Sequence, residues 1–420
     1  MILSGITVLD LTRVVSGPSC TRTLADLGAD VIKIEPPEGD LLRRGVPKAG
    51  RVALGFAQQN AGKRHLSVNL QKPAGRDLVA KLALKADVLV ENYRPGVAAR
   101  LGLGYDDVRA ANPDIVYCSI TGYGQDGPAA GRRAYAPIIH AELGLIDLNA
   151  RERGTAPQPE AVSHADFAVG AQAATAILAA LVHKLRTGTG QHVDVSMAET
   201  MLAMNEWTTV EVNGGFGDEI SPFRPGKAAL LQLKDGTWIQ LPGNPTTGIF
   251  RIATALDKTD ELEARGWDSP ETTQGKEVEV KELLQTWARE FESIKQFETA
   301  LESLRIPLGE VKSLGDTANQ DWAIARAAFV EIDVDGQPVK IPRSPFRFSA
   351  GPVGPTSGSY PQGHDNRTAL QELLDLDDES LDALEALRIP LGEVKSLGDT
   401  VNQDWAIARA AFVEIDVDRK

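Results

Sequence analysis

The sequence predicts an α/β protein with a large domain built on a parallel β-sheet and a smaller α+β domain. Strand-like and helix-like segments alternate over the first 120 residues, which is typical of βαβ units in a doubly wound sheet. From about Trp207 the pattern changes to a hairpin, followed by helices as far as about Thr317. A chain of 420 residues, 42% of them hydrophobic, can form two domains with a core each.

The elements of the large domain follow one another in a regular order. Their hydrophobic patterns predict strands over 6–12, 30–35, 65–70, 87–93 and 114–124, and helices over 17–29, 73–86 and 104–113. Ligands of such sheets bind beyond the carboxyl ends of the strands. These ends are followed by residues 13–18, 35–44, 92–100 and 122–128. The glycines of the last segment lack the G-x-G-x-x-G spacing, so no dinucleotide fingerprint is present.

A single carboxylate, Asp166, stands before a run of small and apolar residues that ends at Leu181. The run predicts a buried helix whose alanines allow close packing. Aspartate is a favoured helix N-cap, because its side chain accepts hydrogen bonds from the free backbone N–H groups of the first turn. The residues alone therefore favour a capping role for Asp166 over a catalytic one.

Charge and cysteine content argue against several classes of function. A net charge of −14 disfavours nucleic acid and anionic membranes as main partners. Cys20 and Cys118 are too few for a disulfide framework, and no His, Cys or Asp cluster has the spacing of a metal site. The first 15 residues do not read as a signal peptide, and no uninterrupted apolar run approaches the roughly 20 residues of a membrane span. We therefore expect a cytoplasmic protein without a bound metal.

One long segment occurs twice. Residues 300–335 recur as 383–418 with only two differences, Ser303 against Ala386 and Ala318 against Val401. Two copies this far apart do not form a solenoid. One fold normally offers one matching groove, so we expect the second copy to be peripheral or poorly ordered and unrelated to the chemistry.

Five segments, taken in order, resemble the family III CoA-transferases (CaiB/BaiF type), which include formyl-CoA and carnitine CoA-transferases. They are "GITVLDLTRVVSGPSCTRTLADLGADVIKIEPPEGD", "NAGKRHLSVNL", "ADVLVENYRPGVAARLGLGYDDVRAANPDIVYCSITGYGQDGP", "HADFAVG" and "GTGQHVDVSMAE". The ordered set is far more specific than any single segment. The resemblance covers roughly residues 2–389.

The resemblance implies a large Rossmann-like domain, a small domain, and a homodimer whose subunits are threaded through each other like linked rings. We then expect the large domain over 1–214 and 326–389, the small domain over 215–325, and an extra tail over 390–420. The implied active site lies between the large domain of one subunit and the small domain of the other.

The resemblance also makes Asp166 the nucleophile that exchanges CoA between an acyl-CoA and a free carboxylic acid. The implied intermediates are an aspartyl mixed anhydride and an aspartyl-CoA thioester. For CoA itself, Arg43 and Arg100 fall where the family places phosphate-binding arginines, whose planar forks match phosphate oxygens. The other positions implied to contact CoA or the acyl group are Leu70, Lys72, Asn92, Tyr93, Arg133 and Tyr135.

The chain departs from the formyl-CoA type beside the first strand. That type has His and Gln where Arg13 and Val15 stand here, so a glutamine that helps hold the acyl carbonyl is missing. Val14, Val15 and Tyr135 are expected near the acyl group and hint that it is apolar.

Two other functions on the same fold remain open. An α-methylacyl-CoA racemase carries a histidine where this chain has Tyr135, and a phenol is a poor base at neutral pH. His140 and His164 lie off that pattern and are more typical of packed or hydrogen-bonded histidines. A catalytically inactive acyl-CoA-binding protein is the other alternative, and the presence of Asp166 argues against it.

Overall fold

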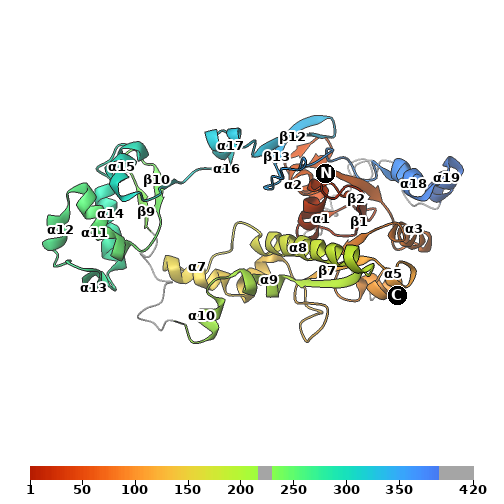
Figure 1. Cartoon of the computed structure of the whole chain (residues 1–420), viewed down its shortest axis with the longest axis horizontal. Coiled ribbons are helices and arrows are strands. Elements are labelled where there is room, and N and C mark those ends of the chain that lie inside the picture. Colours follow the sequence, from red (N-terminus) through yellow and green to blue (C-terminus); the bar gives the residue numbers. More distant parts are fainter. Residues whose placement is uncertain (216–228, 387–420) are drawn as a thin grey trace, which may run out of the picture. The chain divides into compact units, whose positions relative to one another are not determined.

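The computed structural model describes residues 1–215 and 229–386, which form two compact units (Figure 1). The first unit comprises 1–133, 169–196 and the described residues from 329 onward. The second comprises 134–168 and the described residues of 197–328. The described residues of the predicted small domain, 215–325, belong to the second unit, which also includes 134–168 and 197–214 of the predicted large domain.

The first unit is built on a six-stranded sheet. Its strands are β1 (Thr7–Asp10), β2 (Asp30–Glu35), β5 (Lys63–Ser67), β6 (Val88–Glu91), β7 (Val116–Thr121) and β8 (Gln191–Ser196). They pair in the order β5-β2-β1-β6-β7-β8, and every neighbouring pair is parallel. The predicted parallel sheet is therefore confirmed.

The order of the strands reverses between β1 and β6. From β1 the chain winds through β2 to β5 on one side, then returns to β6 beside β1 and continues to β7 and β8 on the other side. In open α/β sheets, ligands bind at this topological switch point, outside the carboxyl ends of the strands. The loops that leave β1 and β6 are thus the first place to look for a site.

Helices and two short hairpins surround this sheet. The helices are α1 (Ser16–Asp26), α2 (Leu54–Asn60), α3 (Pro73–Ala83), α4 (Val97–Arg100), α5 (Tyr105–Ala111), α8 (His164–Thr187), α18 (Asn366–Leu374) and α19 (Asp378–Ala386), with the 3-10 helix η1 (Leu41–Arg44). The hairpins pair β3 (Lys48–Ala49) with β4 (Val52–Ala53), and β12 (Phe329–Val334) with β13 (Gln337–Pro342). The boundary between the two units cuts α8 after Ala168.

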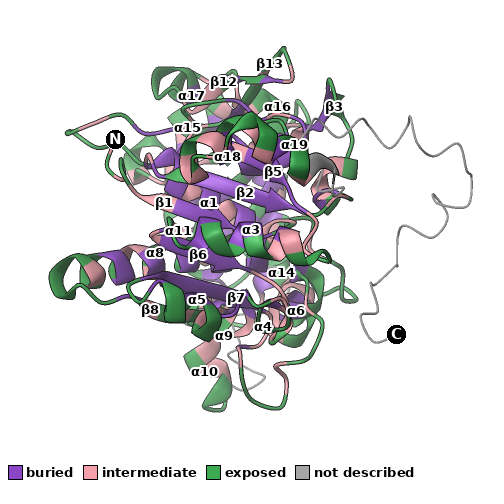
Figure 2. Ribbon diagram, turned by 90° about the vertical axis from the view of Figure 1, so that its right-hand side faces the viewer, coloured by how far each residue is buried: buried purple, intermediate pink, exposed green. Residues whose placement is uncertain are grey.

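The core of the first unit lies against the central strands. Leu9, Ile32, Leu66, Leu89 and Tyr117 of five strands pack in one buried cluster with residues of α3, α5 and α18. Figure 2 shows β1, β2 and β6 as buried strands. These strands are nearly continuous apolar runs because a parallel sheet is covered on both faces.

The second unit contains the hairpin predicted after Trp207. Strand β9 (Ala229–Gln232) pairs antiparallel with β10 (Trp238–Leu241), and β11 (Gly309–Glu310) extends the sheet. The helices of the unit are α6 (Ala136–Glu142), α7 (Leu145–Arg153), the first turn of α8, α9 (Met197–Met204), α10 (Thr208–Val212), α11 (Pro245–Leu256), α12 (Thr259–Glu263), α13 (Pro270–Thr273), α14 (Glu277–Ala288), α15 (Ile294–Ala300), α16 (Leu314–Thr317) and α17 (Asp321–Ala325), with the 3-10 helix η2 (Glu302–Leu304). Buried Trp267, Leu283 and Trp287 pack with Ile239 of the hairpin.

The first copy of the repeated segment ends in β12. Ile332 and Val334 of this strand pack with Val52 and Phe56 in a separate buried cluster. The second copy lies outside the described residues beyond its first four positions, which end α19. The predicted tail over 390–420 also lies outside the described residues.

Helix α8 is long and apolar enough to cross a membrane, judged by length and composition alone. Half of its most apolar window is buried inside the structure. It begins at His164, so Asp166 lies within the first turn rather than at the predicted cap position.

Candidate active site

Asn92, the first residue after β6, joins the two loops that leave the switch point. Its side-chain oxygen accepts a hydrogen bond from the backbone nitrogen of Arg13 at 2.9 Å, and its side-chain nitrogen donates to the backbone oxygen of Arg13 at 2.9 Å. The same nitrogen donates to the hydroxyl of Ser16 at 3.1 Å. These contacts hold the loop after β1. A role for Asn92 in binding the nucleotide of CoA remains a prediction.

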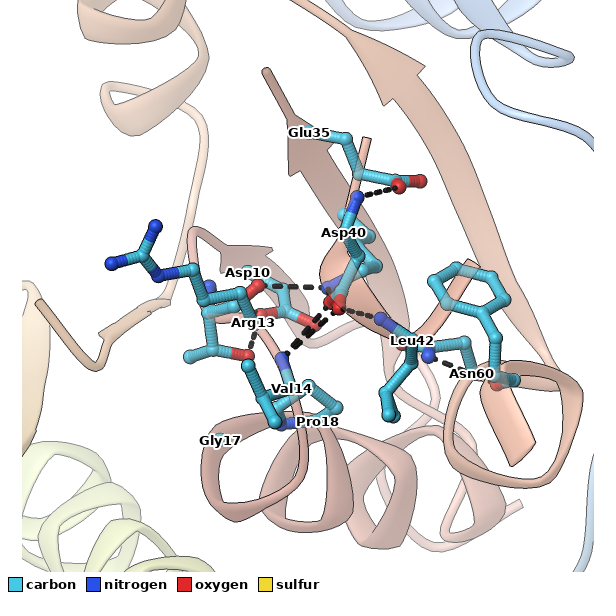
Figure 3. A network of polar contacts seen from close by, with 12 residues as sticks. Asp10, Arg13, Val14, Gly17, Pro18, Glu35, Asp40, Leu42 and Asn60 are labelled. Carbon is cyan, nitrogen blue, oxygen red and sulfur yellow. Dashed lines mark hydrogen bonds and ion pairs between the residues drawn. The ribbon is translucent and has the colours of Figure 1, made fainter. Parts of the chain in front are cut away.

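The loop after β1 is strained at Val14, whose φ is +67°. A β-branched residue rarely adopts this left-handed conformation, which costs about 1–3 kcal/mol. The buried carboxylate of Asp40 accepts a hydrogen bond from the backbone nitrogen of Val14, at 3.2 and 3.1 Å from its two oxygens (Figure 3). Lys33 of β2 donates to the backbone oxygen of Thr12 at 2.8 Å and pairs with Asp40 at 3.2 Å. Lys33 of β2, Asp40 before η1 and Asn92 after β6 therefore hold the backbone of residues 12–14 and the hydroxyl of Ser16.

A second buried ion pair lies beside this loop, between Asp10 of β1 and Lys63 of β5 at 3.1 Å. Asp10 also accepts hydrogen bonds from the hydroxyls of Thr12 and Thr21 at 2.5 and 2.7 Å. Burial alone raises the pKa of a carboxyl, but the charges of Lys63 and Lys33 outweigh it and hold the pKa of Asp10 at about 2. Burial lowers the pKa of Lys63 to about 8, so this lysine is still a cation at neutral pH.

Arg43, predicted to bind a phosphate of CoA, lies in η1 and is engaged with a carboxylate. Its guanidinium donates from Nε and Nη2 to the two oxygens of Glu35, each at 2.6 Å. It also donates to the backbone oxygen of Tyr360 at 3.1 Å and stacks over the ring of Phe56, 3.7 Å from its centroid. The Arg43 side chain is only 10% exposed. This geometry favours a structural role, and phosphate binding by Arg43 remains a prediction.

The other residues predicted to contact CoA in the first unit follow the strand ends as expected. Leu70 follows β5 and Tyr93 follows β6, and both are half-buried against the same core cluster. Lys72 is exposed at the start of α3, and Arg100 is exposed at the end of α4. All four therefore follow carboxyl ends of strands within one unit, where a ligand of such a sheet binds.

Arg133 and Tyr135 flank the boundary between the two units. Arg133 is exposed in the first unit, and Tyr135 precedes α6 in the second with 54% of its surface exposed. Neither is buried among the residues that surround it. Their predicted contact with CoA and the acyl group remains a prediction.

Asp166 is a buried carboxylate without a polar partner. It is 8% exposed, and within residues 1–215 and 229–386 no group donates a hydrogen bond to it or pairs with it. Burial raises the pKa of Asp166 to about 6. At neutral pH most of the carboxylate is ionised yet poorly solvated, which is a state suited to attack on a carbonyl carbon.

His140 of α6 fixes the first turn of α8. Its Nε2 accepts a hydrogen bond from the backbone nitrogen of Ala165 at 3.1 Å, so the imidazole satisfies one of the free N–H groups at the start of the helix. His140 is 1% exposed, and both burial and the charge of His164 lower its pKa, so it is a neutral acceptor. The prediction of a hydrogen-bonded His140 is confirmed for Nε2, whereas its Nδ1 is buried and has no hydrogen-bond partner among the described residues.

Close packing explains the small residues that follow Asp166. A Cβ at Gly170, one helical turn later, would lie 2.1 Å from the hydroxyl oxygen of Ser19 and 2.7 Å from the backbone oxygen of Ser16. A side chain at this position would therefore separate α8 from α1. The glycine keeps the two helices in contact.

Several polar residues of the site carry no motif in the sequence. Lys33, Asp40 and Lys63 each stand alone in a strand or a loop, and only the fold pairs them. Glu91, the last residue of β6, is also buried, and burial raises its pKa to about 7. Lys33 and Glu91 could have been noticed in the sequence as charged residues inside apolar strands, in "DVIKIE" and "DVLVE".

Within the part of the chain that the structure describes, no three His, Cys, Asp or Glu side chains are grouped as metal ligands. Cys20 and Cys118 are both buried free thiols, and burial raises the pKa of each.

The sequence and the fold match known proteins over most of the chain. The profile of CoA-transferase family III matches residues 3–366. The succinate–glutarate CoA-transferase of Agrobacterium fabrum is 31% identical over 88% of this chain and 95% of its own length. The formyl-CoA:oxalate CoA-transferase of Streptomyces coelicolor is 30% identical over 91% of this chain and 98% of its own length. A CaiB/BaiF family protein from Brucella suis has a similar structure, with a TM-score of 0.77 and 30% identity over 88% of this chain and 99% of its own.

Proposed function

Because the chain belongs to CoA-transferase family III and transfers CoA between an acyl-CoA and a free carboxylate, we propose that Asp166 is the nucleophile of this reaction. The observation that carries the proposal is the buried carboxylate of Asp166, which has no polar partner among the described residues and has a raised pKa. A structural carboxylate at such a depth is normally paired or hydrogen-bonded, as Asp10, Glu35 and Asp40 are.

The proposed reaction proceeds through two covalent intermediates. An oxygen of Asp166 attacks the thioester carbonyl carbon, the C–S bond breaks, and CoA thiolate leaves behind a mixed anhydride. The thiolate then attacks the side-chain carbonyl carbon of Asp166, releasing the first carboxylate and forming an aspartyl-CoA thioester. The acceptor carboxylate repeats both steps in reverse, so CoA leaves on the acceptor and Asp166 is regenerated.

Burial of Asp166 serves this chemistry in two ways. Poor solvation makes the carboxylate a stronger nucleophile, and exclusion of water protects the anhydride from hydrolysis. Ala168 is small and only half-buried, which favours approach of a thioester, whereas Gly170 is packed against Ser16 and Ser19 of α1. His140 holds the backbone of the residue before Asp166, so the carboxylate starts from a fixed turn of helix.

We propose that CoA is bound mainly by residues at the strand ends of the first unit. Exposed Lys72 and Arg100 supply cations for the phosphates, while Leu70 and Tyr93 supply apolar surface for the adenine. Arg43, Asn92, Arg133 and Tyr135 complete the proposed set. In the protein without ligand, Arg43 and Asn92 also hold the site together through Glu35 and Arg13.

The relatives support a class of substrate. Succinate, glutarate and oxalate, which appear in the names of the similar enzymes, are all dicarboxylic acids. We propose that the acyl group and the acceptor of this protein belong to the same class.

We propose a homodimer of interlocked subunits, with the large domain over 1–214 and 326–389 and the small domain over 215–325. We further propose a cytoplasmic protein without nucleic acid or membrane partners, which the net charge of −14 supports.

Replacement of the nucleophile tests the proposal. Asp166→Ala and Asp166→Asn should abolish transfer of CoA from succinyl-CoA to glutarate, while circular dichroism and CoA binding stay unchanged. Retained transfer in either variant would remove Asp166 from the mechanism. If the alanine variant fails to fold, the asparagine variant, which keeps the shape of the side chain, still tests whether the carboxylate is needed for transfer.

A further inference from the structure

The backbone of Arg13 is held more rigidly than that of an ordinary surface residue. Asn92 bonds both its backbone nitrogen and its backbone oxygen, each at 2.9 Å. The residues on either side are held as well, Thr12 by Lys33 and Val14 by Asp40. These hydrogen bonds lie where the loops after β1 and β6 meet, at the topological switch point of the sheet. The arginine side chain therefore starts from a fixed point at the place where a ligand is expected.

The charges beneath the loop neutralise one another. Three buried carboxylates, of Asp10, Glu35 and Asp40, are matched by three cations, Lys33, Arg43 and Lys63, at distances of 2.6 to 3.2 Å. Arg13 is not needed for this balance. It adds one positive charge to an internally neutral cluster in a protein whose net charge is −14.

The guanidinium of Arg13 has no anionic partner within the residues that the structure describes. Its carbon atom lies 6.0 Å from the centroid of the Tyr93 ring, and no carboxylate is paired with it there. The side chain is exposed, and Figure 3 shows it pointing away from the polar network around Asp40. An exposed guanidinium that pairs with no carboxylate among the described residues can bind a planar anion without first breaking an internal ion pair.

We propose that Arg13 binds the carboxylate of the substrate that does not react, and so selects dicarboxylic acyl groups and acceptors. The inference rests on the proposed function, because it assumes a dicarboxylic substrate. The planar fork of the guanidinium pairs with both oxygens of a carboxylate. Because the backbone of Arg13 is already fixed, binding has to order only its side chain.

The same loop offers an apolar surface next to a charged side chain. Val14 and Val15, which hint at an apolar acyl group, follow Arg13 directly and are half-buried. They suit the methylene chain between two carboxyl groups. Arg13 then suits the charge at its far end.

Two donors of equal chain length separate this role from general CoA binding. Succinyl-CoA carries the second carboxylate and butyryl-CoA lacks it, and glutarate serves as the common acceptor. With an enzyme-bound CoA intermediate, kcat/KM for the donor reports only the first half-reaction. We expect the parent enzyme to prefer succinyl-CoA by about 100-fold, and Arg13→Gln to bring the ratio close to one by lowering kcat/KM for succinyl-CoA alone. Arg13→Lys, which keeps the charge but loses the fork, should retain part of the preference.

Arg109→Gln is the matched control. Arg109 is also exposed and lies over a tyrosine ring, with its guanidinium carbon 5.8 Å from the centroid of Tyr105, but it belongs to α5, which leads into the amino end of β7. This variant should keep the preference of the parent enzyme.

Three outcomes would overturn the inference. An unchanged ratio in Arg13→Gln means that the arginine does not contact the acyl group. Equal losses for both donors, with weaker binding of free CoA, mean that it binds a phosphate of CoA instead. If the parent enzyme transfers CoA but does not distinguish the two donors, only this inference fails, whereas absence of transfer from either donor overturns the proposed function and this inference together.

Discussion

The Nε2 atom of His140 lies 3.1 Å from the backbone nitrogen of Ala165, the residue before Asp166. The contact links α6 to the first turn of α8, and it satisfies a backbone N–H that the helix itself cannot. The contact therefore fixes the backbone next to Asp166, the proposed nucleophile.

Removal of this contact should slow the chemical step more than it weakens binding. We expect His140→Phe to lower kcat by about 10- to 100-fold, because a small shift of the first turn misplaces the carboxylate, while KM for the acyl-CoA stays unchanged. Loss of the acceptor also leaves a buried N–H unpaired, which should lower the free energy of unfolding by about 1–3 kcal/mol. Steady-state kinetics and urea unfolding measure the two effects.

His183→Phe is the control for this prediction, because His183 lies on the same helix with an exposed side chain. It should change neither kcat nor stability. A kcat in His140→Phe equal to that of the parent enzyme would contradict the positioning role.

Activity should fall on the acid side of the pH profile. Burial raises the pKa of Asp166 to about 6, and only the ionised carboxylate attacks the thioester. We expect kcat/KM for the acyl-CoA to be level above pH 7 and to decrease about tenfold per pH unit well below pH 6. A profile that stays level from pH 7 to pH 4.5, in protein shown to be folded at each pH, would exclude Asp166 as the titrating nucleophile.

Asp166→Asn should stabilise the protein while it abolishes transfer. The pKa of Asp166 in the folded protein, about 6, is above the unperturbed value of 3.8, so the folded state disfavours the charged form. This destabilisation is fully present above pH 6 and disappears as the pH falls toward 3.8. At pH 8 the variant should therefore gain at most about 3 kcal/mol of unfolding free energy, the equivalent of a shift of about two pKa units.

Urea unfolding at pH 8 and at pH 4.5 checks the sign of this effect. The stability difference between variant and parent should be clearly smaller at pH 4.5. A variant that is less stable than the parent at pH 8 would show that the carboxylate is stabilised in the folded protein, contrary to its observed surroundings.

Arg43 should matter for stability before it matters for CoA. Arg43→Gln leaves the buried carboxylate of Glu35, which is 1% exposed, without its cation, and breaking such a pair costs about 3–5 kcal/mol. The double variant Arg43→Gln with Glu35→Gln removes both charges and should recover much of this loss. Chemical denaturation measures the stability of each form.

The affinity of the double variant for CoA then isolates the predicted phosphate contact of Arg43. Weaker binding in a stable double variant supports that contact, and unchanged binding assigns Arg43 to structure alone. A single Arg43→Gln variant that loses less than about 1 kcal/mol would contradict the importance of the Glu35 pair.

Hydrophobic patterns in the sequence predicted β1, β2, β5, β6 and β7 and the hairpin of the second unit, but not the order in which the strands pair. A segment such as "DVIKIE" has an apolar pattern that local physics translates directly into a strand, and it is a strand in the structure. The start of α8 was predicted three residues too late, because Asp166 was expected to be the N-cap and the helix begins at His164. Aspartate has the chemistry of a cap, but the helix extends past it to His164, and His140 of another helix satisfies a free N–H of its first turn.

The polar network around the β1 loop could not be predicted. Lys33 and Asp40 are seven residues apart and Asp10 and Lys63 are 53 apart, and only the parallel pairing of β1, β2 and β5 brings them together. The left-handed conformation of Val14 is equally invisible, since a valine gives no sign of it in the sequence. The resemblance to the family pointed to Asp166 as the nucleophile, whereas the contacts of Arg43 and Asn92 are visible only in the structure.

The most direct test of Asp166 as the covalent nucleophile is a mass spectrum of the protein after reaction with succinyl-CoA and hydroxylamine. Hydroxylamine converts an activated carboxyl group into a hydroxamate, so digestion and peptide sequencing locate the group that carried CoA. We predict that the modification falls on Asp166, requires succinyl-CoA and is absent from Asp166→Asn. A hydroxamate on another carboxylate, or no hydroxamate in an enzyme that is transferring CoA, would contradict the mechanism.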